Sequence, residues 1–330
     1  SWQYMAKKFK RLTNEYNSIT IPDFLVSHFR PSTNLIRILA STALSLFVVI
    51  YVSAQIDITG KTFESFLGFN YYTGIAIGFG IVVLYIFSGG FLAVAWSDIF
   101  QGSLMFIALL LLPIIAFFSL SSDVSIINGL KAIDPALLNI WGPGGFNWIN
   151  FATVAGLVSI GIGFLGSPQV YVRFIAIESE DEVEKGKWVA IIYTLLTDTA
   201  AVMIGILGRY ILTKSGQNPE VVLGTAGENV LAMLLNQVMP VVIIGVYIAA
   251  VLSAVMSTVD SLLVVASSAV TRDFYQQIIH PDADEKRLIG LSRKVTLSLA
   301  LLALGVALAV SVLSPNRTVF WFVIFGWSGI

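Results

Sequence analysis

The sequence predicts an all-α, polytopic transmembrane fold, and its composition is the first reason. Of the 330 residues, 56% are hydrophobic and only 12% are charged, and the mean hydropathy is +0.84. A soluble domain carries about 25% charged residues, roughly twice this share. The second reason is that apolar runs of about 20 residues, long enough to cross a bilayer as helices, recur along the chain. Helices are expected because they satisfy their own backbone hydrogen bonds in lipid.

Eight apolar segments are predicted as membrane helices, seven complete and the last partial, within a single transmembrane domain over residues 1–330. In order, they are 34–58, 71–88, 91–120, 149–172, 187–213, 240–271, 291–313 and 318–330. A turn at 88–90 and a loop rich in Gly, Pro and Asn over 121–148 separate successive segments. Apolar residues at helical spacing in 226–238 predict a short amphipathic helix, which lies either across a vestibule or at the membrane interface.

Lysines and arginines determine the predicted orientation, because cytoplasmic loops carry an excess of them. Most of the 19 Lys and Arg residues flank the first segment, or lie between the fourth and fifth or the sixth and seventh. We therefore expect a cytoplasmic N-terminus, in what we take to be a bacterial inner membrane, and a cytoplasmic loop at the acidic stretch 178–185. The chain starts without Met and ends inside an apolar run, so a longer protein is expected beyond both ends.

Composition disfavours several functional classes. There is no cysteine, which excludes disulfides and thiolate metal sites. Both histidines lie in polar loops, so a histidine metal site is not expected. A net charge of −1 gives no indication of nucleic-acid binding. No nucleophile–base pair or cofactor loop is recognisable, so an enzyme is the least favoured class and no organic cofactor is expected.

Four aspartates fall inside the predicted membrane segments, where ionisable groups are costly and usually functional. They are Asp57, Asp98, Asp198 and Asp260, and none has an obvious cationic neighbour in the sequence. Each therefore predicts a bound cation, a proton, or hydrogen bonds from a distant helix. Asp57 also fits an interfacial acid, and Asp98 fits an acid favoured by the dipole at a helix start.

The stretch VLSAVMSTVDSLLVVASSAVTRD, 251–273, carries many oxygen-bearing side chains for a membrane helix. Helical spacing places Ala254, Ser257, Thr258 and Ser261 on one face, with Asp260 at its border. The opposite face is apolar and consists of Val255, Val259, Leu262 and Leu263. Hydroxyls, a freed backbone carbonyl and a carboxylate suit a hard cation such as Na⁺. Small hydroxylated residues also let membrane helices pack closely, and the spacing leaves both interpretations open.

The segment 149–172 contains helix-breaking residues in its second half. They are Gly161, Gly163, Gly166 and Pro168. Proline removes a backbone donor and clashes with the preceding turn, and glycine costs about 1 kcal/mol in a helix. The pattern is typical of a transporter helix that unwinds to line a substrate site, and a simple proline kink also explains it.

Four stretches together resemble the sodium:solute symporter family, most closely its sodium/proline permease branch. They are EYNSITIPDFLVSHF (15–29), GGFLAVAWSDIFQGSLM (89–105), GFLGSPQVYVRF (163–174) and LSAVMSTVDSLLVVASSAVTRDFY (252–275). The resemblance implies a LeuT-type core of two five-helix repeats with inverted topology. It also implies that this core is truncated at both ends, beginning after the second core helix and stopping inside the tenth.

The resemblance implies sodium-binding roles for the polar face of 251–273. Ala254 would contribute a backbone carbonyl, and Ser257 and Thr258 their hydroxyls, with the missing first core helix completing the site. Asp98 matches a membrane aspartate that the family links to sodium coupling. Some members resemble a two-sodium arrangement in which this aspartate meets Ser257, the residue at 260 and Ser261. Asp260 stands where relatives have a small polar residue, which would strengthen a second cation site or make it protonatable.

Substrate contacts are implied less completely. Tyr51 falls where the proline branch has a substrate-site tyrosine, and Pro168 matches the proline of the unwound helix. Ile160 and Phe164 stand where that branch has Trp and Tyr. Asp57, where the branch is apolar, is a candidate for facing a substrate amine.

The function expected from these residues is sodium-coupled symport of a small organic solute, with an amino acid such as proline as the first candidate. Pantothenate or a sugar, a transporter-like sensory module of a larger signalling protein, and a passive channel are the alternatives. The expected partners are the solute, Na⁺ as coupling ion and membrane lipid. Nucleic acid is not expected, and protein partners are left open.

Overall fold

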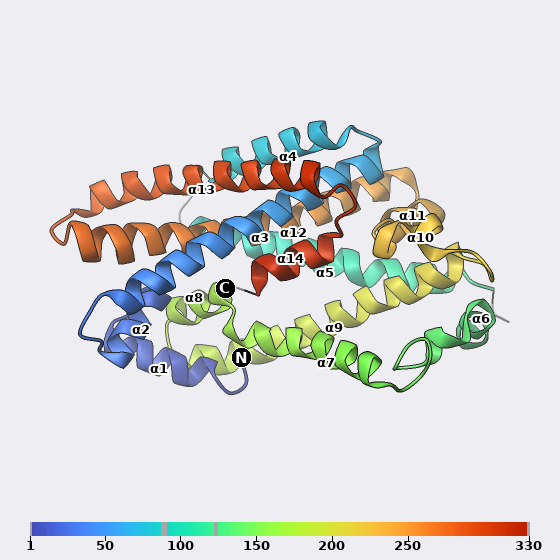
Figure 1. Cartoon of the computed structure of the whole chain (residues 1–330), viewed down its shortest axis with the longest axis horizontal. Coiled ribbons are helices and arrows are strands. Elements are labelled where there is room, and N and C mark those ends of the chain that lie inside the picture. Colours follow the sequence, from blue (N-terminus) through green and yellow to red (C-terminus); the bar gives the residue numbers. More distant parts are fainter. Residues whose placement is uncertain (1, 87–90, 122–124, 329–330) are drawn as a thin grey trace. The chain divides into compact units, whose positions relative to one another are not determined.

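The computed structural model describes residues 2–86, 91–121 and 125–328, and all regular elements within these ranges are helical (Figure 1). Six helices or helix runs in these ranges are long and apolar enough to cross a membrane. They are Leu35–Leu67, Val94–Phe118, Trp148–Ala176, Glu180–Leu212, Val241–Ile279 and Glu285–Leu313. The predicted all-α transmembrane class is therefore confirmed. The predicted segment 71–88 corresponds to a shorter apolar helix, and the turn predicted at 88–90 lies outside the described residues.

The α-helices are α1 (Ala6–Tyr16), α2 (Ile21–Phe29), α3 (Leu35–Leu67), α4 (Tyr71–Ile86), α5 (Phe91–Phe118), α6 (Ile126–Ile133), α7 (Trp148–Gly163), α8 (Pro168–Ala176), α9 (Glu180–Leu212), α10 (Pro219–Leu223), α11 (Val230–Val238), α12 (Val241–Ser268), α13 (Glu285–Leu313) and α14 (Val319–Trp327). Three short 3₁₀ elements cover Pro135–Leu138, Phe164–Gly166 and Thr225–Gly227, and α12 continues as a π-helix over Ala269–Ile279. The partial segment predicted at 318–330 corresponds to α14, and its last two residues are outside the described ranges.

The first membrane helix, α3, is longer than the predicted segment 34–58, because it continues past Asp57 to Leu67. The prediction ended the helix where charged and polar residues begin. In the structure Asp57 is fully buried and paired, and the Thr59 hydroxyl donates to the carbonyl four residues earlier. The helix ends at Gly68, whose φ of 66° is the left-handed conformation that glycine adopts without strain.

The acidic stretch 178–185 is largely helical, so its prediction as a loop was wrong. Helix α9 begins at Glu180, and three acidic residues occupy its first turn, where the helix dipole favours negative charge. Val183 belongs to a buried cluster with Phe174 of α8. This apolar anchor holds the start of α9 in place, and a reading based on charge alone overlooked it.

The interruption predicted in 149–172 is present. Helix α7 ends at Gly163, a 3₁₀ turn covers Phe164–Gly166, and Pro168 opens α8. Proline suits the first position of a helix because the backbone N–H it lacks has no partner there. The π-helix at the end of α12 was not predicted. Such turns are rare and frequently occur at functional sites.

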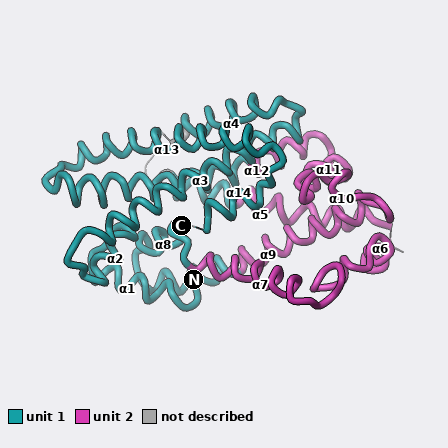
Figure 2. The backbone as a smooth tube through the Cα atoms, in the orientation of Figure 1, with its two compact units in different colours: residues 1–102, 166–191, 252–330 teal, residues 103–165, 192–251 magenta. Residues whose placement is uncertain are grey.

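The chain divides into two compact units, coloured separately in Figure 2. Unit 1 comprises Ser1–Gly102, Gly166–Ile191 and Leu252–Ile330, and unit 2 comprises Ser103–Leu165 and Ile192–Val251. The prediction of one transmembrane domain over 1–330 stays a prediction.

Helix α3 is the centre of unit 1 and contacts α2, α4, α13, α14 and the π-helical end of α12. Its buried residues Val48 and Val52 share an apolar core with Leu262 and Leu263 of α12 and Ala303 of α13. Because α4 also contributes to this core, through Ile75 and Val82, four helices together fix Leu262 and Leu263 of α12 relative to α3.

Helices α1 and α2 pack on α8 within the same unit. The buried Lys10 ammonium donates to the Ile175 carbonyl at 2.8 Å, near the end of α8, where carbonyls lack partners within the helix. Burial lowers the pKa of Lys10. Asp273 of the π-helix accepts hydrogen bonds from Thr20, just before α2, at 2.7 Å and from Arg37 of α3 at 2.9 Å.

Unit 2 is held by close helix contacts. The Tyr247 hydroxyl of α12 donates to the Ala108 carbonyl of α5 at 2.9 Å. Gly208 of α9 lies so close to Val230 that a Cβ at this position would overlap it. The amphipathic helix predicted within 226–238 is present as α11.

Candidate functional site

The two faces of α12 differ in burial, as the residues on each face predict. Val255, Val259, Leu262 and Leu263 are all buried in the core of unit 1. Ala254, Ser257 and Thr258 are only partly buried. The apolar face therefore fixes the helix, and the polar face is turned away from this core.

Two of the predicted sodium ligands lie next to each other on that face. The Thr258 hydroxyl donates to the Ala254 carbonyl at 2.9 Å. A threonine in a helix often bonds the carbonyl four residues earlier, so this bond alone is also consistent with ordinary packing. It nevertheless places a hydroxyl and a carbonyl oxygen at one point of α12, as a hard cation requires.

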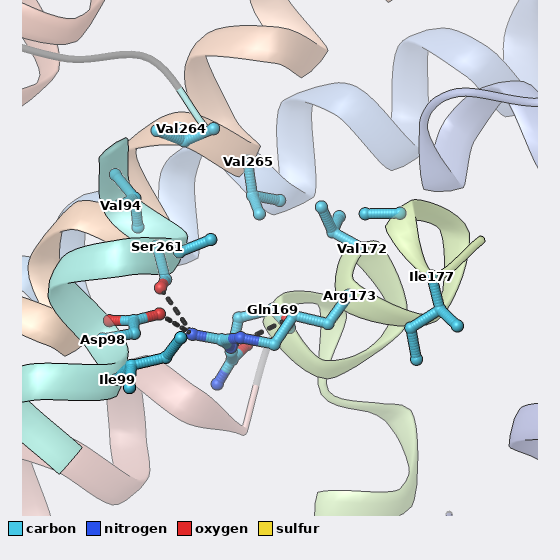
Figure 3. A pocket seen from close by; sticks show the side chains of 12 residues that line it. Val94, Asp98, Ile99, Gln169, Val172, Arg173, Ile177, Ser261, Val264 and Val265 are labelled. Carbon is cyan, nitrogen blue, oxygen red and sulfur yellow. Dashed lines mark hydrogen bonds and ion pairs between the residues drawn. The ribbon is translucent and has the colours of Figure 1, made fainter. Parts of the chain in front are cut away.

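Asp98 joins α5 to this polar face. The Ser257 hydroxyl donates to Asp98 Oδ1 at 2.5 Å, and Arg173 donates to Asp98 Oδ2 at 2.5 Å. The same guanidinium nitrogen donates to the Ser261 hydroxyl at 2.9 Å. Figure 3 shows Arg173 reaching from α8 to both partners. The predicted neighbours Asp98, Ser257 and Ser261 are thus brought together by a fourth residue, Arg173.

Asp260 lies beside this group without a hydrogen-bond partner. It is 2% exposed, and neither of its carboxylate oxygens has a partner among the described residues. It directly precedes Ser261, whose hydroxyl accepts from Arg173. A buried carboxylate without partners is costly, so the site calls for a cation or a proton at Asp260.

A cavity of about 520 Å³ opens onto these polar groups, within the size range of small-molecule sites. Its polar lining consists of Asp98, Gln169, Arg173 and Ser261, and its apolar lining includes Ile99, Val172, Ile177, Val264 and Val265 (Figure 3). The Gln169 side-chain oxygen is buried without a partner in the described part of the chain. The Asp98–Arg173 pair is therefore accessible from a cavity.

The predicted substrate residues fall in different units. Tyr51 and Asp57 of α3 and Pro168 of α8 belong to unit 1, whereas Ile160 and Phe164 belong to unit 2. Tyr51 is partly buried against the core of unit 1. The role of this set stays a prediction.

Asp57 is paired much more completely than its sequence context suggested. Its Oδ1 accepts a hydrogen bond from the Tyr71 hydroxyl at 2.5 Å and another from Arg317. Its Oδ2 lies 3.9 Å from the Lys61 ammonium, one turn further along α3. Arg317 also donates to the Tyr71 hydroxyl at 2.6 Å.

Sequence reasoning missed Arg173, Arg317 and Tyr71. The two arginines were used only as charges flanking the membrane segments, which determine the predicted orientation. Arg173 lies 75 residues from Asp98, and Arg317 lies 260 residues from Asp57. The signal that was available is that each arginine borders a membrane segment beside a proline or glycine break. The fourth aspartate, Asp198, is exposed on α9.

The described residues contain no group of three or more His, Cys, Asp or Glu that would hold a metal ion. The oxygen-rich group formed by α12 and Asp98 of α5 instead combines hydroxyls, a carbonyl and two carboxylates. Ionisable groups on the interior side of membrane helices, beside a broken helix, characterise membrane proteins that carry ions or solutes. Fold and site together define a polytopic transporter.

Comparisons with known proteins identify the kind of transporter. A family model for the sodium:solute symporter family matches residues 1–330, and the chain belongs to this family. It is 33% identical to the high-affinity proline transporter PutP of Bacillus subtilis over 330 residues, which cover 100% of this chain and 67% of the relative. It is 30% identical to the sodium/proline symporter of Escherichia coli, with 100% and 64% covered. The chain thus spans about two thirds of the length of these relatives.

The solved structure of a Na⁺-coupled sialic acid symporter, in a substrate-bound outward-open state, has the same fold. Its TM-score with this chain is 0.74 at 18% identity, and 99% of this chain and 70% of the other are covered. The predicted LeuT-type transporter architecture is therefore confirmed.

Proposed function

We propose that the protein of which this chain is part carries out sodium-coupled symport of a small organic solute, with an amino acid such as proline as the first candidate. The observation that carries the proposal is the meeting of Asp98, Ser257 and Ser261 beside the Thr258–Ala254 pair within unit 1. Family membership and the proline-transporting relatives support it.

The principal sodium site is proposed at Ala254, Ser257 and Thr258. Their carbonyl and hydroxyl oxygens are ligands that a hard cation accepts without a formal negative charge. The first core helix that the family resemblance implies would complete the coordination.

A second cation site is proposed between Asp98, Ser257, Asp260 and Ser261. Two carboxylates in one partly buried group favour a positive charge there, and Arg173 supplies only one such charge. The unpartnered oxygens of Asp260 support a further cation, either Na⁺ or a proton.

Coupling requires that Na⁺ and the solute both favour the same conformation. Sodium entering down a membrane potential of about 100 mV releases about 2.3 kcal/mol per ion, in addition to its concentration gradient. We place the N-terminus of the chain in the cytoplasm of a bacterial inner membrane. This orientation puts Asp98 and the cavity beside it in the cytoplasmic half, on the side where ions leave.

Proline is proposed because the two relatives described above are named as proline transporters. Ile160 and Phe164, which differ from the pattern of that branch, leave room for another solute. The substrate site is proposed beside Tyr51 and the helix break that Pro168 closes.

The test is uptake by the full-length protein in proteoliposomes, with an inward gradient of Na⁺ or of K⁺ and a panel of amino acids, pantothenate and sugars. We expect saturable uptake of one solute class that requires Na⁺. Uptake that is equal in both gradients, or that does not saturate, rejects symport. Thr296→Ala is a matched control for variants of Thr258, because Thr296 makes the same bond to a carbonyl four residues earlier on α13, also at 2.9 Å.

A further inference from the structure

The residues around Asp57 form a cluster that the proposed transport mechanism does not use. We propose that this cluster, consisting of Asp57, Lys61, Tyr71 and Arg317, positions α14 over the candidate substrate residue Tyr51. Asp57 is then a positioning residue and does not itself contact the solute. The predicted effect on uptake rests on the proposed function, whereas the position of α14 can be tested without it.

The cluster binds both the side chain and the backbone carbonyl of Arg317. Its guanidinium donates to Asp57 and to the Tyr71 hydroxyl, and its side chain is only 9% exposed. Its backbone carbonyl accepts a hydrogen bond from the Lys61 ammonium at 3.0 Å. Arg317 lies two residues before Val319, where α14 begins. The start of α14 is therefore fixed to α3 through both the side chain and the backbone of one residue.

The pairing resists partial opening. Asp57 is 0% exposed, so movement of Arg317 away from it leaves a buried carboxylate with a weaker set of partners. The guanidinium also lies over the Tyr71 ring, 5.4 Å from its centroid. Tyr71 opens α4, so the cluster joins α3, α4 and the connection before α14 in one arrangement.

A second contact holds α14 at the level of Tyr51. Gly326 packs on the backbone of α3, where a Cβ would lie 2.7 Å from the Tyr51 nitrogen and 2.8 Å from its Cα. No side chain fits there unless α14 moves away. Along α3 the two attachment points, at Tyr51 and Asp57, are six residues apart, or about 9 Å at 1.5 Å per residue.

These two contacts define the distance between α14 and the part of α3 that carries Tyr51. If Tyr51 contacts the solute, a shift of α14 changes the shape of the space beside it. The effect then falls on the apparent affinity for the solute more than on the maximal rate.

The first measurement uses no transport. A cysteine is introduced at Tyr51 in a cysteine-free full-length background, and its reaction with a membrane-impermeant maleimide is timed from the outside. We expect Arg317→Gln and Gly326→Ala each to accelerate labelling several-fold. Gly305→Ala is the control, because nothing lies within 4 Å of a Cβ at this exposed position on α13. Equal labelling rates in all four backgrounds overturn the proposal.

The second measurement is uptake with Tyr51 intact. Asp57→Asn and Arg317→Gln should each raise the half-saturating solute concentration several-fold, with a smaller change in maximal rate per folded protein. The double variant should be no worse than the worse single variant, because both residues act through one contact. A change in maximal rate alone, or fully additive effects, overturns the positioning role.

The two measurements also separate this proposal from the proposed function. Faster labelling in the variants, in a protein that shows no sodium-dependent uptake of any solute, supports the position of α14 and rejects symport. Sodium-dependent uptake in which the variants change neither the labelling rate nor the half-saturating solute concentration supports symport and rejects the positioning role of the cluster. Because Gly326→Ala leaves every charge in place, it tests the proposal even if Arg317→Gln does not fold.

Discussion

Two of the aspartate–arginine pairs in unit 1, Asp57–Arg317 and Asp98–Arg173, differ in their access to solvent. Asp57 is 0% exposed, and Arg317, Tyr71 and Lys61 surround it. Asp98 and Arg173 have side chains that are 17% and 39% exposed, and both line a cavity. Beside Asp98 lies Asp260, a second carboxylate without hydrogen-bond partners among the described residues, whereas Asp57 lies between two cations, Arg317 and Lys61.

The difference assigns the two pairs different tasks. A sealed ion pair cannot exchange partners without exposing a buried charge, so it holds structure. An ion pair that faces a cavity can exchange one cationic partner for another, because water and ions reach it. The same chemistry therefore serves positioning at Asp57 and, as we propose, ion coupling at Asp98.

The largest expected effect is a difference in the free energy of unfolding that is lost when Arg317 or Arg173 is replaced. Arg317→Gln should destabilise the folded protein by about 3–5 kcal/mol, because it leaves Asp57 buried and short of a partner. Arg173→Gln should cost only about 0.2–1 kcal/mol, as for a solvent-accessible pair. Thermal unfolding of the two purified variants in one detergent measures the difference. Equal losses would mean that access to the cavity does not distinguish the pairs.

Asp98→Asn should have the next largest effect, and on sodium dependence rather than on abundance. The amide keeps the shape and can still accept from Ser257, but it removes the negative charge. A loss of about 2 kcal/mol in cation binding corresponds to a roughly thirtyfold higher Na⁺ concentration for half-maximal uptake. Uptake is measured against Na⁺ concentration and normalised to folded protein in the membrane. A fall in abundance with unchanged Na⁺ dependence would assign Asp98 a folding role, as for an acid at a helix start.

Thr258→Ala should have a smaller effect of the same kind, because it removes one neutral oxygen from the proposed principal site. A loss of about 1.4 kcal/mol corresponds to tenfold in the half-saturating Na⁺ concentration. Thr258→Ser keeps the oxygen and should restore most of the affinity, and Thr296→Ala should leave the Na⁺ dependence unchanged. If Thr258→Ala behaves like Thr296→Ala, the hydroxyl serves helix packing only.

Sequence reasoning reached the parts of the site that one helix defines. The spacing of Ser257, Thr258 and Ser261 follows from 3.6 residues per turn, and the break before Pro168 follows from the chemistry of glycine and proline. Both are local properties. The fold class followed from composition in the same way.

Contacts between distant parts of the chain were not predictable from one sequence. Nothing near Asp57 indicates that Arg317 pairs with it, and so the end of α3 was placed too early. The start of α9 was likewise missed, because Val183 gains its stabilising contacts from α1 and α8. Both features depend on tertiary contacts, an ion pair at Asp57 and apolar packing at Val183, which local sequence patterns do not show.

The smallest expected effect sharpens the comparison most, because it concerns Asp260, a buried carboxylate without a hydrogen-bond partner among the described residues. Asp260→Ser should change the number of cations carried per solute while the half-saturating solute concentration stays within about twofold, since the principal site at Thr258 is intact. Paired flux measurements of Na⁺ and solute give the ratio. The control is Asp198→Ser, which removes an exposed membrane aspartate on α9 and should leave the ratio unchanged.

Two results are informative beyond the expected one. If the Na⁺ ratio is unchanged but solute uptake loses a dependence on external pH, Asp260 carries a proton and the second cation is not sodium. If neither quantity changes, the second cation site is rejected, and Arg173 alone balances the charge of Asp98. If a cation binds at Asp260, cations can enter and leave beside the Asp98–Arg173 pair. The buried Asp57–Arg317 pair does not allow such exchange, because the Asp57 side chain is 0% exposed.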